Sequence, residues 1–239
     1  MHVIHLTTAP ARPAPQGVRR GTMSDRWASD AKPGPGREPP VRELDSAVVV
    51  VTGVMASGKP TVAQRLAENL PRAIHLRGDA FRRMIVSGRE EFSPEPTAEA
   101  RAQLRLRHQA SAAVADLYAR AGWTVLVQDV IPGEHLDACL DSVTTRPLYL
   151  VVLAPAREEV ARREAGRRKD GYGGPWTVDL LDDTLRGVTA RRGLWLDTTH
   201  QTPVQTVDSV PAGLTTARIA DRAGSPAERR DRRPAAGDR

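Results

Sequence analysis

Short apolar runs alternate along the chain with longer stretches in which apolar residues recur every three or four positions. Apolar runs of strand length stand at residues 47–52, 73–76, 123–130, 148–154 and 193–198. Helical spacing is found between them, at residues 59–70, 97–121 and 177–186, and in a charged segment that ends near Gly171. This alternation is typical of parallel strands joined by crossover helices. We therefore expect an α/β fold, a three-layer sandwich with one parallel five-stranded sheet between helices.

The two ends of the chain differ from this central region. Residues 1–44 and 217–239 are rich in Pro, Gly, Ala and Arg, and each segment carries seven basic against four acidic residues. The net charge of +6 therefore belongs to the ends. Such segments bury too little apolar surface to offset the entropy of ordering them. We expect a disordered tail at 1–44, one folded domain at 45–215 and a second disordered tail at 216–239, with nucleic-acid contacts limited to weak, salt-sensitive ones through the tails.

The composition favours a globular protein of the cytoplasm. Hydrophobic residues make up 40% of the chain and charged residues 27%. The apolar runs are too short to cross a bilayer, and the N-terminus lacks the pattern of a secretory signal, so we expect no membrane partner. A single cysteine, Cys139, rules out an internal disulfide. Because it stands at helical spacing in HLDACLDSV, we expect a packed core thiol rather than a nucleophile.

The first strand runs directly into GVMASGKPT, residues 53–61. A GxxxxGK pattern between a strand and a helix is the sequence form of a phosphate-binding loop, in which backbone N–H groups and a helix N-terminus surround an anion. Gly53 and Gly58 permit the tight turn, and Lys59 is expected to reach the β- and γ-phosphates of a nucleotide. The expected nucleotide contacts are Gly53, Met55, Ala56, Ser57, Gly58, Lys59, Pro60 and Thr61.

Pro60 stands where this pattern normally has Ser or Thr, whose hydroxyl holds Mg²⁺. Proline removes that hydroxyl and one backbone N–H, but it is tolerated in the first turn of a helix. Thr61 remains, and we expect it to contact the inner phosphates or, with adjustment, the metal. The loop therefore predicts a phosphate site with weaker positioning of Mg²⁺.

Two carboxylates stand at the expected ends of strands. Asp129 closes the third strand and is the expected holder of Mg²⁺ or of its water shell; the alternative is an aspartate that caps the next loop. Asp79 follows the second strand in HLRGDAFRRM, at the edge where open α/β sheets bind ligands. We expect Asp79 to accept the proton of a substrate hydroxyl, and a helix N-cap is the alternative. Arg82 and Arg83 are expected to hold an acidic substrate or to flank the site.

The segment at residues 156–171 is unusually basic and is followed by glycines. Arg163 and Arg167 are four residues apart, so both can point from one helix face at a triphosphate, as arginines of a mobile lid do. The alternative is an ordinary solvated helix, with Glu158 and Glu159 paired to the arginines four positions later.

Taken together, residues 47–212 resemble the chloramphenicol phosphotransferase-like branch of small-molecule P-loop kinases. The resemblance rests on GVMASGKPT, QDVIPGE, VARREAGR and LDTTHQT, and GDAFRR with EFSPE is similar to adenylyl-sulfate kinases. It implies a P-loop kinase-like fold and transfer of the γ-phosphoryl group of ATP to a hydroxyl of a small molecule. By it, Lys59 matches the loop lysine, Asp79 the base, and Arg163 and Arg167 the lid arginines.

Two departures leave other functions open. Gln128 stands where the family has a first acidic residue, and Pro60 alters the loop. Residues 84–97 are polar and acidic with little aromatic surface, so they do not indicate an aryl substrate. The alternatives are a nucleotide-binding regulatory module with weak or no transfer activity, an adenylyl-sulfate-kinase-like activity, and polyanion binding through the ends.

Overall fold

A computed structural model describes residues 42–131, 133–166 and 175–220. Its five strands form one parallel sheet in the order β2-β3-β1-β4-β5. The strands are β1 (Val48–Gly53), β2 (Ala73–Arg77), β3 (Thr124–Gln128), β4 (Leu148–Leu153) and β5 (Leu194–Leu196). All five expected strands are present, and the predicted α/β class with a parallel five-stranded sheet is confirmed.

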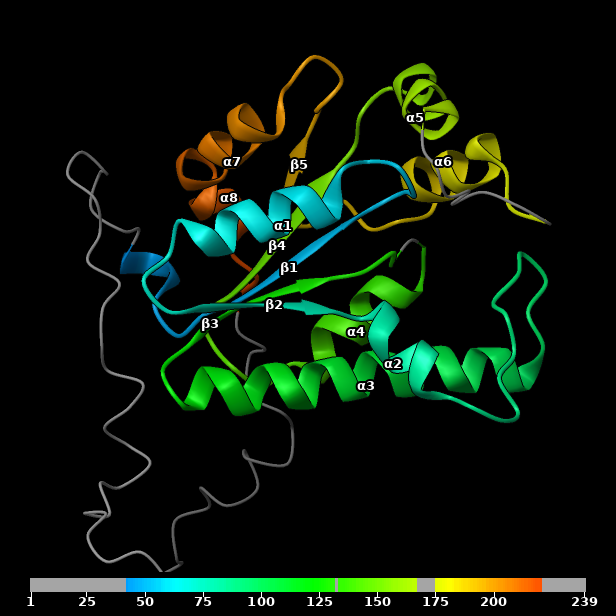
Figure 1. The fold of residues 1–239 in the computed structure, drawn as a ribbon, viewed down its shortest axis with the longest axis horizontal. Coiled ribbons are helices and arrows are strands. Elements are labelled where there is room, and N and C mark those ends of the chain that lie inside the picture. Colours follow the sequence, from blue (N-terminus) through cyan, green and yellow to red (C-terminus); the bar gives the residue numbers. More distant parts are fainter. Residues whose placement is uncertain (1–41, 132, 167–174, 221–239) are drawn as a thin grey trace, which may run out of the picture. The chain divides into compact units, whose positions relative to one another are not determined.

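Helices cover both faces of the sheet (Figure 1). Helices α1, α7 and α8 contribute to one apolar cluster with Val49 and Val51, whereas α3, α4 and α6 contribute to another with Val48 and Val50. Because side chains alternate along a strand, β1 is buried from both sides. The helices are α1 (Lys59–Glu68), α2 (Asp79–Met84), α3 (Ala98–Arg120), α4 (His135–Ser142), α5 (Arg157–Ala165), α6 (Val178–Gly187), α7 (Pro203–Ala212) and α8 (Leu214–Ala217), and a short 3-10 helix (Arg42–Leu44) precedes β1.

The long helix α3 begins and ends as its sequence indicates. The hydroxyl of Thr97 accepts a hydrogen bond from the N–H of Ala100 at 2.9 Å. At the other end Gly122 has a φ of 83°, the left-handed conformation that follows many helices. Helix α5 ends at Ala165, and the expected continuation toward Gly171 lies outside the described residues.

The packed chain extends slightly beyond residues 45–215. Leu44 is fully buried, and Ile219 belongs to the apolar cluster under α3 and donates its N–H to the carbonyl of Leu148 at 2.9 Å. Cys139 is buried, and burial raises the pKa of its thiol to about 12, which fits the packed thiol that its spacing indicates. Within the described part of the chain, no helix has the length and apolarity needed to span a bilayer.

Candidate functional site

The turn between β1 and α1 has the backbone of an anion-binding loop. Gly53, Ala56 and Gly58 all have positive φ, of 143°, 59° and 95°. A Cβ on Gly53 would lie 2.4 Å from the carbonyl oxygen of Leu153, so β4 leaves room only for glycine there. The loop therefore depends on the residues that its sequence motif specifies.

Lys59 is the first residue of α1, and its side chain is buried within the loop. It is 3% exposed, and its Nζ donates to the carbonyl of Val54 at 2.6 Å. Ser57 is 1% exposed, and its hydroxyl is buried without a hydrogen-bond partner among the described residues. A buried ammonium group beside a helix N-terminus concentrates positive potential at one point. This arrangement suits a phosphate group.

Pro60 and Thr61 lie in the exposed first turn of α1. The expectation that proline is accommodated in the first helical turn is confirmed. The N–H of Thr61 donates to the carbonyl of Gly58 at 3.1 Å. Both side chains are accessible to a ligand at the N-terminus of the helix.

Gln128, the last residue of β3, and Asp129, which follows it, lie on opposite faces of the sheet. Leu126 packs in the cluster with α1, and Val127 packs in the cluster with α3. By alternation, Gln128 faces α1, the same side as Leu126, whose register partner on β2, His75, contacts Gln64 of that helix at 3.0 Å. Asp129 consequently lies on the α3 side, away from the helix that begins at the loop.

Asp129 is held there by Arg107 of α3 in a buried ion pair. Nε of Arg107 donates to Oδ2 at 2.7 Å, Nη2 donates to Oδ1, and the N–H of Val130 also donates to Oδ1 at 2.7 Å. Burial lowers the pKa of Arg107 to about 10, so the guanidinium is still charged at neutral pH. Both oxygens of the expected Mg²⁺ ligand therefore have partners. Across the part of the chain that the structure describes, no group of three or more His, Cys, Asp and Glu residues is arranged to hold a metal ion.

Asp79 is the first residue of α2 and is held by the two arginines that follow it. Its oxygens lie 3.2 Å from Nε of Arg82 and 2.6 Å from Nη2 of Arg83. Partial burial acts to raise the pKa of Asp79, but the hydrogen bond from Arg82 and the charges of Arg83 and Arg107 outweigh it, and the pKa is lowered. Arg82 also pairs with Glu91 at 2.5 Å. Asp79 is thus an ionised group fixed at the carboxyl end of β2.

Arg163 of α5 reaches the phosphate-binding loop. Its Nη1 lies 3.4 Å from the carbonyl oxygen of Ser57, and its Nη2 donates to the carbonyl of Thr198 at 2.8 Å. Its Nε donates to Glu159 at 2.7 Å. The sequence indicated the pairing of Arg163 with Glu159 as an alternative to a lid role, but it did not indicate the carbonyls of Ser57 and Thr198. Arg167, its expected companion, lies outside the described residues.

An aromatic cluster that the sequence did not indicate lies next to Glu91. The ring of Phe92 is 5.3 Å from that of His135 and 6.3 Å from that of Trp176, between centroids. The indole N–H of Trp176 donates to the carbonyl of Phe92 at 2.8 Å. The three rings come from distant segments, so residues 84–97, which contain one aromatic residue, gain an aromatic surface only through folding.

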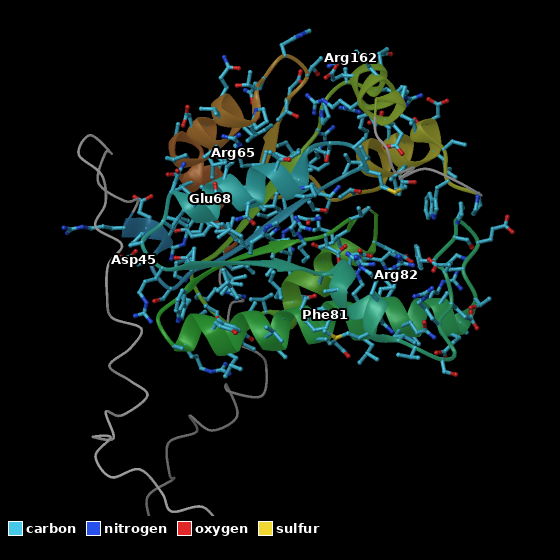
Figure 2. All side chains as sticks on the ribbon, in the orientation of Figure 1. Asp45, Arg65, Glu68, Phe81, Arg82 and Arg162 are labelled. Atoms are coloured by element: carbon cyan, nitrogen blue, oxygen red, sulfur yellow. The ribbon has the colours of Figure 1, made fainter. Side chains whose placement is uncertain are left out.

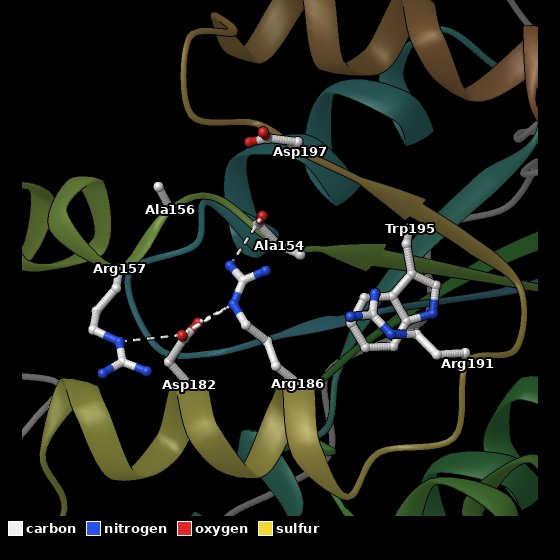
Figure 3. Close-up of a pocket in the computed structure, with 8 residues that line it drawn as sticks. All are labelled: Ala154, Ala156, Arg157, Asp182, Arg186, Arg191, Trp195 and Asp197. Atoms are coloured by element: carbon white, nitrogen blue, oxygen red, sulfur yellow. Dashed lines mark hydrogen bonds and ion pairs between the residues drawn. The ribbon is translucent and has the colours of Figure 1, made fainter.

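A pocket of about 390 Å³ opens beside the ends of β4 and β5 (Figure 3). Arg186 extends from α6 to the carbonyl of Pro155, at 2.8 Å, and the guanidinium of Arg191 lies over the ring of Trp195, 4.0 Å from its centroid. The pocket wall includes Ala154, one residue beyond the partner of Gly53 in the sheet. The pocket therefore lies at the carboxyl ends of the strands, as the phosphate-binding loop does.

The fold and the loop define a P-loop kinase-like α/β domain. The family described as an AAA domain (AAA_33) matches residues 48–179, and the chain belongs to this family. A search of curated proteins gives no match.

Solved structures, among them two kinases, have a similar fold. An unliganded sugar kinase from Janibacter sp. HTCC2649 is 23% identical, with a TM-score of 0.52 over 72% of this chain and 95% of that one. The APS kinase CysC of Mycobacterium tuberculosis, solved with AMPPNP and APS, is 20% identical, with a TM-score of 0.52 over 74% and 99%. The tunicamycin resistance protein of Deinococcus radiodurans is 17% identical, with a TM-score of 0.52 over 73% and 99%. At these identities the likeness establishes the fold.

Proposed function

We propose that this chain is a phosphotransferase that moves the γ-phosphoryl group of ATP to a hydroxyl of a small molecule. The observation that carries the proposal is the position of Lys59, buried at the N-terminus of α1 inside a turn with three residues of positive φ. Backbone N–H groups of this turn and the helix dipole bind the β- and γ-phosphates. Arg163 lies within reach of the same loop and stabilises charge on the transferring group.

The hydroxyl oxygen attacks the γ-phosphorus while the bond to the β–γ bridging oxygen breaks, and ADP leaves. Asp79, at the end of β2, orients the hydroxyl and accepts its proton. The lowered pKa makes Asp79 a weak base, so its main contribution is orientation, with the proton leaving late in a loose transition state. Arg82 and Arg83 hold Asp79 and present positive charge to an acidic acceptor.

Among the residues that the structure describes, no group of three or more His, Cys, Asp and Glu side chains is arranged to hold a metal ion. Pro60 has no hydroxyl, and Asp129 is paired with Arg107. We therefore treat Mg²⁺ as part of the MgATP substrate and assign it no protein carboxylate.

The test uses the full chain, MgATP and a panel of small hydroxyl compounds that includes adenylyl sulfate, with ADP release as the readout. We expect acceptor-dependent ADP release, and we expect Lys59→Met to abolish it. Arg65→Met, on the exposed side of the same helix, is the matched control and should retain it. Failure of every acceptor, together with unchanged ATP binding in Lys59→Met, would refute the proposal.

A regulatory nucleotide-binding module is the second candidate. The Asp129–Arg107 pair favours it, because the pair removes the expected metal ligand while the phosphate-binding loop is retained. Titration calorimetry with and without Mg²⁺ separates the two functions. Tight ATP binding that ignores Mg²⁺, without transfer to any acceptor, supports the module, whereas strong Mg²⁺ dependence with turnover supports the kinase.

A further inference from the structure

The carboxylate of Glu159 is the centre of a small network on α5. Its Oε1 accepts from Nε of Arg163 at 2.7 Å, and both oxygens accept from Arg162, each at 2.7 Å. The three side chains differ in exposure: 13% for Glu159, 24% for Arg163 and 74% for Arg162. Arg162 lies on the outer side of the helix (Figure 2). Glu159 and Arg163 therefore form the inner part of the network.

The bond to Glu159 sets the direction of the rest of the Arg163 side chain. A guanidinium group is planar and rigid, so fixing Nε also fixes both terminal nitrogens. In Arg163 these nitrogens point to the carbonyls of Ser57, in the phosphate-binding loop, and of Thr198, after β5. One side chain thus connects α5 to two other segments at the same edge of the sheet.

We propose that Glu159 is a positioning residue, which holds Arg163 in the orientation that serves the phosphate-binding loop. This inference rests on the proposed function. Glu159 acts through Arg163 and does not touch the nucleotide. An arginine that must rotate into place loses part of its benefit in the transition state, because the orientation has to be established during the reaction. Removing Glu159 should therefore lower kcat more than it weakens ATP binding.

Glu159 should have the same effect at every working pH. Hydrogen bonds from Arg162 and Arg163 lower the pKa of Glu159 to about 2, so its carboxylate is ionised throughout an ordinary assay range. The proportional loss in the Glu159→Ala variant should be constant from about pH 6 to about pH 9. A proton-transfer role would instead change the shape of the pH profile.

The test is a double-mutant cycle on the full chain. We expect Glu159→Ala to lower kcat about tenfold, Glu159→Gln to lower it less, and the dissociation constant of ATP to change less than about threefold. In an Arg163→Ala background, Glu159→Ala should have no further effect. The control is Glu158→Gln, an exposed neighbour without an ion pair among the described residues; it should match the parent chain.

Three results would overturn the inference: additive effects of Glu159→Ala and Arg163→Ala, an equal loss in Glu158→Gln, or a matching loss of thermal stability. The proposed function is judged separately. If the parent chain binds ATP but transfers to no acceptor, the kinase proposal fails, and the same cycle is measured on ATP dissociation constants, with non-additivity expected. If the parent chain does not bind ATP, both proposals fail.

Discussion

Gly78 lies so close to Asp129 that a Cβ atom on the glycine would be 2.0 Å from Oδ2 of the aspartate. Asp129 has little freedom to move away, because Arg107 and the N–H of Val130 hold its oxygens. The N–H of Gly78 also donates to the carbonyl of Gln128 at 3.0 Å, which fastens the end of β2 to the end of β3. The glycine before Asp79 is therefore needed for space, since its own φ is an ordinary −58°.

Gly78→Ala should destabilise the protein. The added methyl group would displace the carboxylate from Arg107 or move β2, and overpacking of this kind typically costs about 1–3 kcal/mol. Urea denaturation measures the loss. Gly187→Ala is the matched control: it lies at the exposed end of α6 with no atom within 4 Å of a new Cβ, so stability should be unchanged or slightly raised. Equal stability of the two variants would show that Asp129 can move away.

Arg107→Met, in helix α3, should be strongly destabilising. It would leave the carboxylate of Asp129, 4% exposed, buried without its charge partner, a loss of about 3–5 kcal/mol. The double variant Arg107→Met/Asp129→Asn should lose much less than the sum of the two single changes. Additive losses would mean that the two side chains contribute little as a pair.

His108 should make the protein less stable as the pH falls. Burial lowers its pKa from 6.5 to about 3, and the nearby charges of Arg107 and His135 act in the same direction. Below about pH 6.5 this histidine is protonated in the unfolded chain, whereas in the folded chain it stays neutral down to about pH 3. The free energy of unfolding therefore decreases as the pH falls across this interval.

The slope attributable to His108 approaches about 1.4 kcal/mol per pH unit at its steepest. Urea denaturation between pH 7 and pH 4.5 measures it, and His108→Leu should give a flatter profile. His75 and His135 also have lowered pKa values, so some slope remains in the variant. His200→Gln, an exposed control, should keep the parent profile. An equal slope in the parent chain and His108→Leu would contradict the assignment.

The strands of the sheet could be predicted because an apolar run is a local feature of the sequence, which can be recognised without knowing the contacts between distant segments. The sequence also predicted the loop, since Gly53 and Gly58 occupy positions whose backbone requires glycine. It did not predict the environment of Asp129. Alternation along the strand places Gln128 and Asp129 on opposite faces of the sheet. Only the packing of α1 and α3 decides which of the two residues lies on which face.

Arg107 could not be recognised from sequence for a related reason. Helix α3 carries several arginines, and nothing in their spacing distinguishes the one that turns inward from the solvated ones. The cluster of Phe92, His135 and Trp176 likewise depends on how three separate segments meet. Non-local contacts of this kind leave no periodic signal.

Two substitutions of Pro60 separate the effects of the two groups that proline lacks, a side-chain hydroxyl and a backbone N–H. Pro60 lies in the exposed first turn of α1, so both a hydroxyl and a backbone N–H can be restored without disturbing the core. We expect Pro60→Ser to raise turnover more than ATP affinity, because its hydroxyl would help to hold Mg²⁺. Pro60→Ala restores the N–H alone, and it should strengthen ATP binding without changing the Mg²⁺ dependence.

Adding Gln128→Asp to Pro60→Ser should strengthen the effect, because residue 128 faces α1, where Asp129 does not. The measurement is the Mg²⁺ concentration that gives half-maximal phosphoryl transfer, which should fall from the parent chain to Pro60→Ser and fall again in the double variant. Turnover in Pro60→Ser equal to that in Pro60→Ala would show that the hydroxyl does not reach the metal. In that case Mg²⁺ is held by the nucleotide and by groups other than residue 60.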